Sequence, residues 1–161
     1  MEAKTTTVYQ IRALDHAIEL LYHPLAPEIP TKRLALTAIA DFFNYLPLSA
    51  SGTSSADTRQ ILFLSTGRVL FTGGSGLSHS IGNSIGTKYN ISHGITSCLM
   101  LAAVVHLKAE TKLDEARQIA RAVEAVRRSR TGDTVGDARA VGDAIAELVG
   151  SLGHTGTLTE V

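Results

Sequence analysis

The sequence contains no tryptophan, and aromatic residues make up only 5 % of a chain that is 44 % hydrophobic. Leucine, isoleucine, valine and alanine must therefore fill the core. The single cysteine, Cys98, excludes a disulfide framework within the chain and is typical of a reducing compartment. A chain of this length and composition builds one hydrophobic core, so we expect one domain spanning residues 1–161.

The sequence also lacks a net charge and a long apolar segment. Its 15 acidic and 15 basic residues balance, whereas a nucleic-acid-binding domain carries a basic excess. No apolar run reaches the roughly 18 residues that a membrane span needs. The first residues lack the apolar core of a signal peptide. We therefore expect a cytoplasmic protein that binds neither nucleic acid nor a membrane.

Apolar residues recur at helical spacing along most of the chain, which predicts an all-α helical bundle of about seven helices. We expect the first helix over residues 8–23 and the end of the second at Pro47, because proline disrupts a helix interior. The other predicted helices span residues 56–71, 76–87, 93–107 and 112–130, followed by one that starts at Asp133.

The predicted helix over residues 93–107 is apolar on all sides, which is typical of a central core helix. We therefore expect it to form the centre of the bundle together with the helix over residues 76–87. His106 is expected near its C-terminal end, as a solvated cation that complements the helix dipole.

Small and polar residues gather between residues 73 and 94. His79 and Asn83 lie four residues apart, so they share one face of the predicted helix. Its glycines keep that helix thin and allow another backbone to approach closely. Ser92 is expected to cap the next helix, and His93 lies at the start of that helix.

These residues resemble a motif of the iron-containing alcohol dehydrogenases, a family that includes a maleylacetate reductase branch. The family carries a Gly-x-x-His-x-x-x-His-x-x-Gly run and then a His-Gly pair, which correspond to residues 76–94. The first and last histidines, which are metal ligands in the alcohol dehydrogenases, correspond to His79 and His93. The middle histidine, which lines the substrate pocket of the family, corresponds to Asn83.

An earlier family element, Asp-x-x-x-His-Ala-x-Glu, resembles residues 12–19 and supplies the other two metal ligands of the family. Its histidine corresponds to His16, whereas Arg12 stands where the family has a ligating aspartate. The run over residues 11–22 is most similar to the maleylacetate reductase branch. The two motifs agree in order and spacing, so the resemblance covers roughly residues 8–107.

The resemblance implies the fold of the helical C-terminal domain of these enzymes, which is dehydroquinate synthase-like, without their nucleotide-binding domain. The sequence contains no strand-turn-helix with a G-x-G-x-x-G motif, and the glycine-rich run at residues 73–76 follows no convincing strand. We therefore expect no dinucleotide cofactor bound to this chain.

We also expect no metal, because Arg12 replaces a carboxylate with a permanent cation. A unit charge about 4 Å away contributes roughly 4 kcal/mol at an effective dielectric constant of ~20. The alternative is a zinc or iron ion held by His16, His79 and His93, since three neutral imidazoles can hold zinc.

The remaining groups suit proton and charge chemistry on a small carbonyl compound. Arg12 presents a planar fork of donors to a carboxylate or carbonyl oxygen. Imidazoles can move protons near neutral pH, and Asn83 can donate to a developing oxyanion. The predicted catalytic residues are Arg12, His16, His79, Asn83 and His93.

Three functions fit these observations. The first is a stand-alone, metal- and nucleotide-independent enzyme of the cyclase or isomerase type, pericyclic chemistry included, in natural product biosynthesis. Met1 before a whole helical domain and the altered ligand positions favour this function. The second is an oxidoreductase remnant or subunit that needs a separate nucleotide-binding domain, and the third is a non-catalytic binding module.

We expect a small-molecule substrate and a homo-oligomer, most simply a homodimer. In the family the helical domain packs against the nucleotide domain, so a helical domain without that partner exposes an apolar face. Exposed apolar patches of more than a few hundred Å² usually mark an interface.

Overall fold

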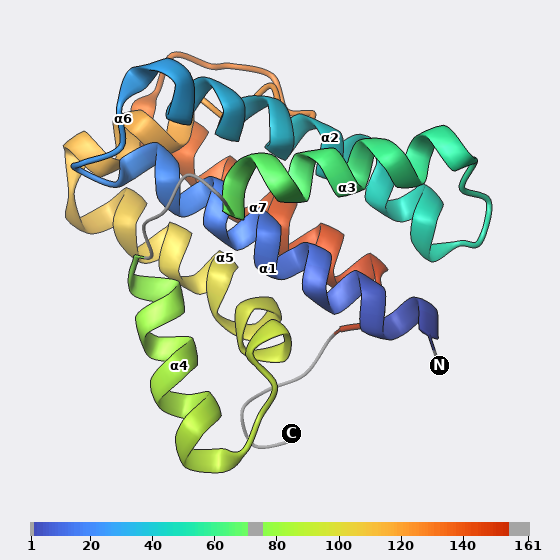
Figure 1. Ribbon diagram of the computed structural model, residues 1–161. Helices are drawn as coiled ribbons and strands as arrows, with labels where there is room; N and C mark the ends of the chain where they lie inside the picture. Colours follow the sequence, from blue (N-terminus) through green and yellow to red (C-terminus); the bar gives the residue numbers. More distant parts are fainter. Residues whose placement is uncertain (1, 71–75, 155–161) are drawn as a thin grey trace.

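The computed structural model describes residues 2–70 and 76–154 and contains no strand among them, which confirms the all-α prediction. Seven α-helices and one short π-helical turn follow one another along the chain (Figure 1). They are α1 (Glu2–Tyr22), η1 (Glu28–Lys32), α2 (Arg33–Ala50), α3 (Ala56–Leu70), α4 (Leu77–Tyr89), α5 (His93–Thr111), α6 (Leu113–Ala120) and α7 (Thr134–Ser151).

The first helix, α1, forms the centre of the bundle. Figure 1 shows α2 and α3 on one side of α1 and α5 on the other, and α1 also contacts α4 and α6. Its apolar residues recur at helical spacing and are fully buried, among them Ile11, Leu14, Ile18 and Leu21. The prediction that the helices over residues 76–87 and 93–107 form the centre is therefore wrong for the first of them, whereas the second, α5, packs against α1, α4, α6 and α7.

The two motif helices differ in burial. The fourth helix, α4, lies at the edge of the bundle and buries only Ser78, His79 and Gly82. The long α5 packs against four other helices, yet Leu107 on its outer side is 47 % exposed, so α5 is not buried on all sides. His106 lies within α5 rather than at its end, with its Nε2 atom 3.2 Å from Oδ1 of Asp143 on α7.

Two predicted helix ends also differ from the structure. Pro47 lies inside α2, in its last turn. Proline costs one backbone hydrogen bond there, but little helix follows that it could disrupt. The predicted helix over residues 112–130 ends at Ala120, and the backbone then forms turns up to Arg127, whose φ of 61° is left-handed. The apolar residues of these turns stay buried, which explains why the sequence pattern resembles one continuous helix.

The predicted start of the last helix is confirmed. Asp133 is the N-cap of α7, and its Oδ1 atom accepts a hydrogen bond from the N–H of Val135 at 3.1 Å. The C-cap residue of α4, Asn90, lies in the left-handed region. Of the glycine-rich run at residues 73–76, only Gly76 lies within the described residues, and most of the C-terminal tail lies outside them.

No helix in the described part of the chain combines the length and the hydrophobicity that crossing a membrane requires.

Candidate functional site

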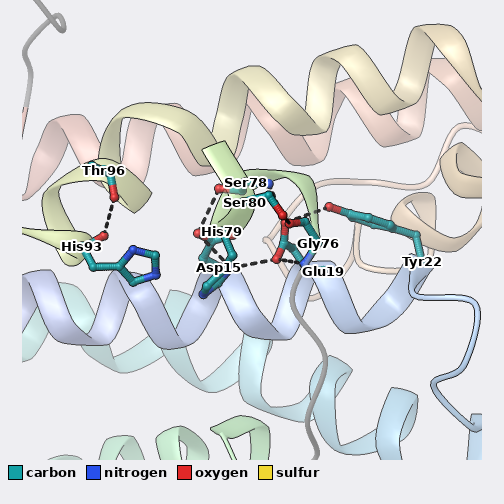
Figure 2. Close-up of polar contacts among 9 residues, drawn as sticks. All are labelled: Asp15, Glu19, Tyr22, Gly76, Ser78, His79, Ser80, His93 and Thr96. Carbon is teal, nitrogen blue, oxygen red and sulfur yellow. Dashed lines mark hydrogen bonds and ion pairs between the residues drawn. The ribbon is translucent and has the colours of Figure 1, made fainter. Parts of the chain in front are cut away.

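A buried carboxylate from α1 anchors the start of α4 (Figure 2). The N-cap residue of α4 is Gly76, which has no side chain to accept a hydrogen bond. Glu19 accepts these bonds instead, from the N–H of Ser78 at 2.7 Å and from the N–H of Gly76. A Cβ atom at position 76 would lie 2.7 Å from Oε1 of Glu19, so the contact requires glycine. Glu19 therefore joins α4 to the central helix.

The same carboxylate orients His79. Oε2 of Glu19 lies 2.7 Å from Nδ1 of His79, whose side chain is 3 % exposed. A proton on Nδ1 is donated to the carboxylate, and Nε2 is then buried with no hydrogen-bond partner among the described residues. Asp15, also buried, lies 3.6 Å from the same Nδ1 and accepts a hydrogen bond from Ser78 Oγ at 2.9 Å. These four residues form the Asp15–Glu19–His79 cluster, with Ser78 at its edge.

Burial and charge act in opposite directions within this cluster. Burial raises the pKa of Asp15 to about 7. Burial also acts to raise the pKa of Glu19, but hydrogen bonds from His79 and from backbone N–H groups outweigh it and lower that pKa. For His79 burial acts to lower the pKa, whereas the hydrogen bond to Glu19 and the nearby carboxylates raise it overall. The cluster therefore combines a charged Glu19–His79 pair with a carboxyl group that titrates near neutral pH.

Three imidazole rings gather where α1, α4 and α5 meet. The ring centroids of His16 and His79 are 3.9 Å apart, and those of His79 and His93 are 5.0 Å apart. His93 is the first residue of α5, and its Nδ1 atom is buried without a hydrogen-bond partner in the described structure. Burial and then the positive charge of Arg12 lower the pKa of His93. The rings thus connect the carboxylates of α1 to the start of α5.

Arg12 lies one turn before His16 on α1 and lines an open pocket of about 470 Å³. Its Nε atom is buried without a hydrogen-bond partner, and its guanidinium forms no ion pair with the carboxylates of the described residues. The pocket is lined by Val8, Tyr9, Arg12, Ser92, His93, Gly94, Ile95 and His154. Its wall therefore carries a permanent positive charge that no carboxylate of the described residues neutralises.

The structure does not bring every predicted residue to this pocket. Asn83 is exposed on α4 and is not among the residues that line it. His154 does line it, although the weak pattern of the C-terminal segment gave no reason to select this residue. Asp15 and Glu19 were not predicted as site residues either. Their spacing of four residues, beside the apolar stripe of α1, is the pattern that could have identified them.

The family assignment follows from a comparison with known proteins. Residues 6–161 match the model of the C-terminal domain of the Fe-containing alcohol dehydrogenase family. The chain belongs to this family. The resemblance to this family and the expected helical C-terminal fold are both confirmed.

Two relatives of known activity are the 1-propanol dehydrogenases PduQ of Citrobacter freundii and of Salmonella typhimurium (strain LT2). Each is 29 % identical over 99 residues, which cover 60 % of this chain and 26 % of the relative. The matched region of this chain thus spans about a quarter of the length of these curated relatives.

The fold matches that of an archaeal halo-thermophilic alcohol dehydrogenase from a Red Sea brine pool, ADH/D1, solved bound to NZQ. The TM-score is 0.89 at 20 % identity, covering 99 % of this chain and 41 % of that one. A mutant of the same enzyme matches with the same TM-score.

The metal of the family can be tested against the residues present here. The three imidazoles offer suitable nitrogen ligands, and Nε2 of His79 is without a partner among the described residues. Arg12, however, places a permanent cation at a ligand position, and its charge acts on both His79 and His93. Ligand atoms of Asp15, Glu19 and His79 lie within 4.8 Å of one another, but they already bind one another, Ser78 and backbone N–H groups. This donor set does not fit a divalent ion.

Proposed function

We propose that this chain is the carbonyl-binding helical half of an oxidoreductase in which charged and protonated side chains replace the metal of the family. Family membership supports oxidoreductase chemistry over the cyclase or isomerase that the altered motif first suggested. The observation that carries the proposal is Arg12, which forms no ion pair with the described residues, at the position of a family metal ligand and beside the imidazoles that lead to Glu19.

Charge development explains how such a site acts. When a hydride adds to a carbonyl carbon, negative charge develops on the oxygen, and a fixed cation stabilises that charge. Arg12 supplies the cation, and the oxygen then needs a proton. His79 holds one against Glu19, and its ring lies next to that of His93 at the pocket wall. In such an enzyme a reduced dinucleotide, held outside this chain, supplies the hydride.

A reconstitution experiment tests this proposal. The purified chain is mixed with the separately expressed nucleotide-binding domain of a 1-propanol dehydrogenase, and oxidation of NADH or NADPH is followed with small aldehydes and 2-oxo acids. We expect turnover only when both parts are present. Dinucleotide-independent conversion by the chain alone would contradict the proposal, as would the absence of turnover in every combination.

The second candidate is the non-redox cyclase or isomerase, which the cluster supports because it can exchange protons without a dinucleotide. Asp15 titrates near neutral pH, and the Glu19–His79 pair lies beside it. Exchange of the α-protons of small ketones in D₂O, followed by proton NMR, separates this candidate from the first. Binding of these ketones without proton exchange and without reduction would instead favour the non-catalytic binding module.

Independence from metal has a test of its own. Arg12→Asp restores the carboxylate of the family, so we expect this variant to bind zinc at a one-to-one ratio, whereas the parent protein does not. Elemental analysis after dialysis measures the ratio. A parent protein that carries stoichiometric metal would refute the metal-free site. If Arg12→Asp and Arg12→Ala both turn over like the parent, Arg12 has no role in the reaction.

We also propose a homodimer or higher homo-oligomer. Support comes from exposed apolar side chains, of which Phe63 and Leu64 are neighbours on α3 and are 76 % and 47 % exposed. Light scattering at micromolar concentration measures the assembly, and a monomer of 17.1 kDa would contradict it.

A further inference from the structure

The outer face of α3 carries an exposed aromatic ring beside an open space. The helix packs against α1 and α2 through buried residues such as Leu62 and Val69, which lie on its other side (Figure 1). Phe63 lies in the middle of the outer face and is 76 % exposed. Gly67 follows one turn later on the same face, and a Cβ atom there would meet no other atom within 4 Å.

Packing among the described residues explains neither of these two residues. Phenylalanine is usually buried in soluble proteins, yet most of the Phe63 side chain is exposed. Glycine is one of the least favourable residues in a helix interior, yet no described group fills the space beside Gly67. A glycine allows another chain to approach a helix closely. The two residues together therefore indicate a contact with another molecule.

The charges of α3 favour a second copy of the same helix as that molecule. Between Arg59 and Arg68 the sequence has no charged residue, so the centre of the face is neutral. Asp57 lies in the first turn of α3, and Arg68, which is 38 % exposed, lies in its last turn on the same edge. In an antiparallel pair of α3 helices, Asp57 of each copy shares an edge of the contact with Arg68 of the other copy. A parallel pair would instead place like charges beside each other, which is unfavourable.

We infer that α3 packs antiparallel against α3 of a second copy, with Phe63 of each copy in the space over Gly67 of the other. In a contact with two-fold symmetry, each pair of touching residues occurs twice with the copies exchanged. One ring and one open space per chain therefore form two identical contacts. Leu64, which is 47 % exposed beside Phe63, extends the apolar area. The inference names the interface of the homo-oligomer proposed above and rests on that proposal.

Replacement of Phe63 tests the contribution of the ring. In Phe63→Lys the ring is lost and like charges enter the contact, so we expect the dissociation constant of the dimer to rise at least about a hundredfold. Sedimentation velocity at micromolar concentrations of the full chain measures this constant. Leu25→Lys, which replaces another apolar side chain that is 84 % exposed, is the matched control and should dimerise like the parent. Circular dichroism confirms that both variants fold. Unchanged dimerisation of Phe63→Lys would overturn the inference.

Replacement of Gly67 separates a fitted contact from general apolar association. Gly67→Leu adds apolar surface and helix propensity, and its Cβ atom meets no other atom within 4 Å in the single chain. General association would therefore become tighter in this variant. The fitted contact predicts the opposite, a dimer at least about tenfold weaker, because leucine fills the space that receives the ring. A Gly67→Leu protein that dimerises as tightly as the parent, or more tightly, would overturn the inference.

This inference and the proposed homo-oligomer fail in different ways. A parent protein that sediments as a monomer of 17.1 kDa at micromolar concentration would overturn both. If the parent dimerises and the variants at positions 63 and 67 dimerise equally well, the homo-oligomer stands and the contact between α3 helices fails. The oxidoreductase proposal is decided by turnover of the reconstituted enzyme, on which sedimentation has no bearing.

Discussion

The helices α4 and α7 both begin with backbone N–H groups bound by carboxylates, but the carboxylates come from different distances along the chain. At α7, Asp133 binds the N–H of Val135, and the buried Asp137 binds the N–H and hydroxyl groups of Thr131. At α4, the acceptor is Glu19, 57 residues before Gly76. The carboxylate that accepts these hydrogen bonds thus comes from the adjoining segment at α7 and from the central helix at α4.

The difference shows how a structural cap becomes part of a functional site. A local carboxylate such as Asp137 only fixes a turn. Glu19 fixes the end of α4, orients His79 and lies beside Asp15, all with one carboxylate. Because these roles share one group, changes at Glu19 affect stability and site geometry together.

The largest effect is expected when the stability of a Glu19 variant is compared with that of an Asp137 variant. Glu19→Ala leaves His79 and two backbone N–H groups without their acceptor, so we expect a loss of about 3–5 kcal/mol in the free energy of unfolding, as for breaking a buried ion pair. Asp137→Ala should cost less, because the affected loop lies at the surface. Urea unfolding followed by circular dichroism measures both variants. Equal losses in the free energy of unfolding would show that it has no consequence whether the carboxylate at a helix start comes from a nearby or a distant part of the chain.

Asp15→Asn should change how stability depends on pH. The pKa of Asp15 is raised from 3.8 to about 7 in the folded protein, so the folded state retains a proton that the unfolded state loses. Stability therefore falls by a few kcal/mol as pH rises from about 4 to 7. The raised pKa of His79 adds a loss only above the ordinary value of 6.5, and the lowered pKa of Glu19 acts only below 4.5.

In Asp15→Asn the side chain is neutral at every pH, so this fall between about pH 4 and 6 should disappear. Unfolding titrations at half-unit steps of pH measure the slope. Asp114→Asn, at an exposed position on α6, serves as the matched control and should keep the slope of the parent. A variant at position 15 with an unchanged slope would show that another group causes the pH dependence.

The smallest effect concerns glycines within the same two helices. In Gly82→Ala on α4, the new Cβ atom would lie 2.8 Å from Oγ1 of Thr96, which is itself bound to the carbonyl of His93. We expect a loss of about 1–3 kcal/mol, as for overpacking. In Gly136→Ala on α7, the Cβ atom meets only the carboxylate of Asp133, a side chain that can turn away. We expect the gain in helix propensity, up to about 1 kcal/mol, to offset the weakened cap.

Thermal unfolding of these two glycine variants measures the difference. A Gly82→Ala protein as stable as the parent would show that α4 is not closely packed against α5.

Periodicity predicted the helices well because each apolar stripe records which face is buried. The starts of α3, α5 and α7 follow from local sequence, as Asp133 illustrates. Periodicity failed at Ala120, because the apolar residues that follow stay buried in turns with the same spacing. It also could not identify the central helix, since hydrophobicity alone does not say how many neighbours a helix has.

The candidate site was predicted only in part. The family motifs selected Arg12 and the three histidines, which the structure brings together. The spacing of Asp15 and Glu19 could have identified them as a pair, but their roles depend on contacts across 57 to 63 residues, which that spacing does not specify. Asn83 shared a helical face with His79, but burial differs between the turns of α4 because only its first turn packs against α1.

The distant cap of α4 has a consequence for the order in which the chain assembles. A contact between residues so far apart requires closure of a long loop, which costs more entropy than closure of a short one. The start of α4 therefore gains its acceptor only after α1 has found its place, whereas α7 carries its own. We expect amide hydrogens of α4 to exchange with solvent through a partial opening that leaves α1 and α2 protected. Equal protection of α4 and α1 in native-state hydrogen exchange would show that the two form a single cooperative unit.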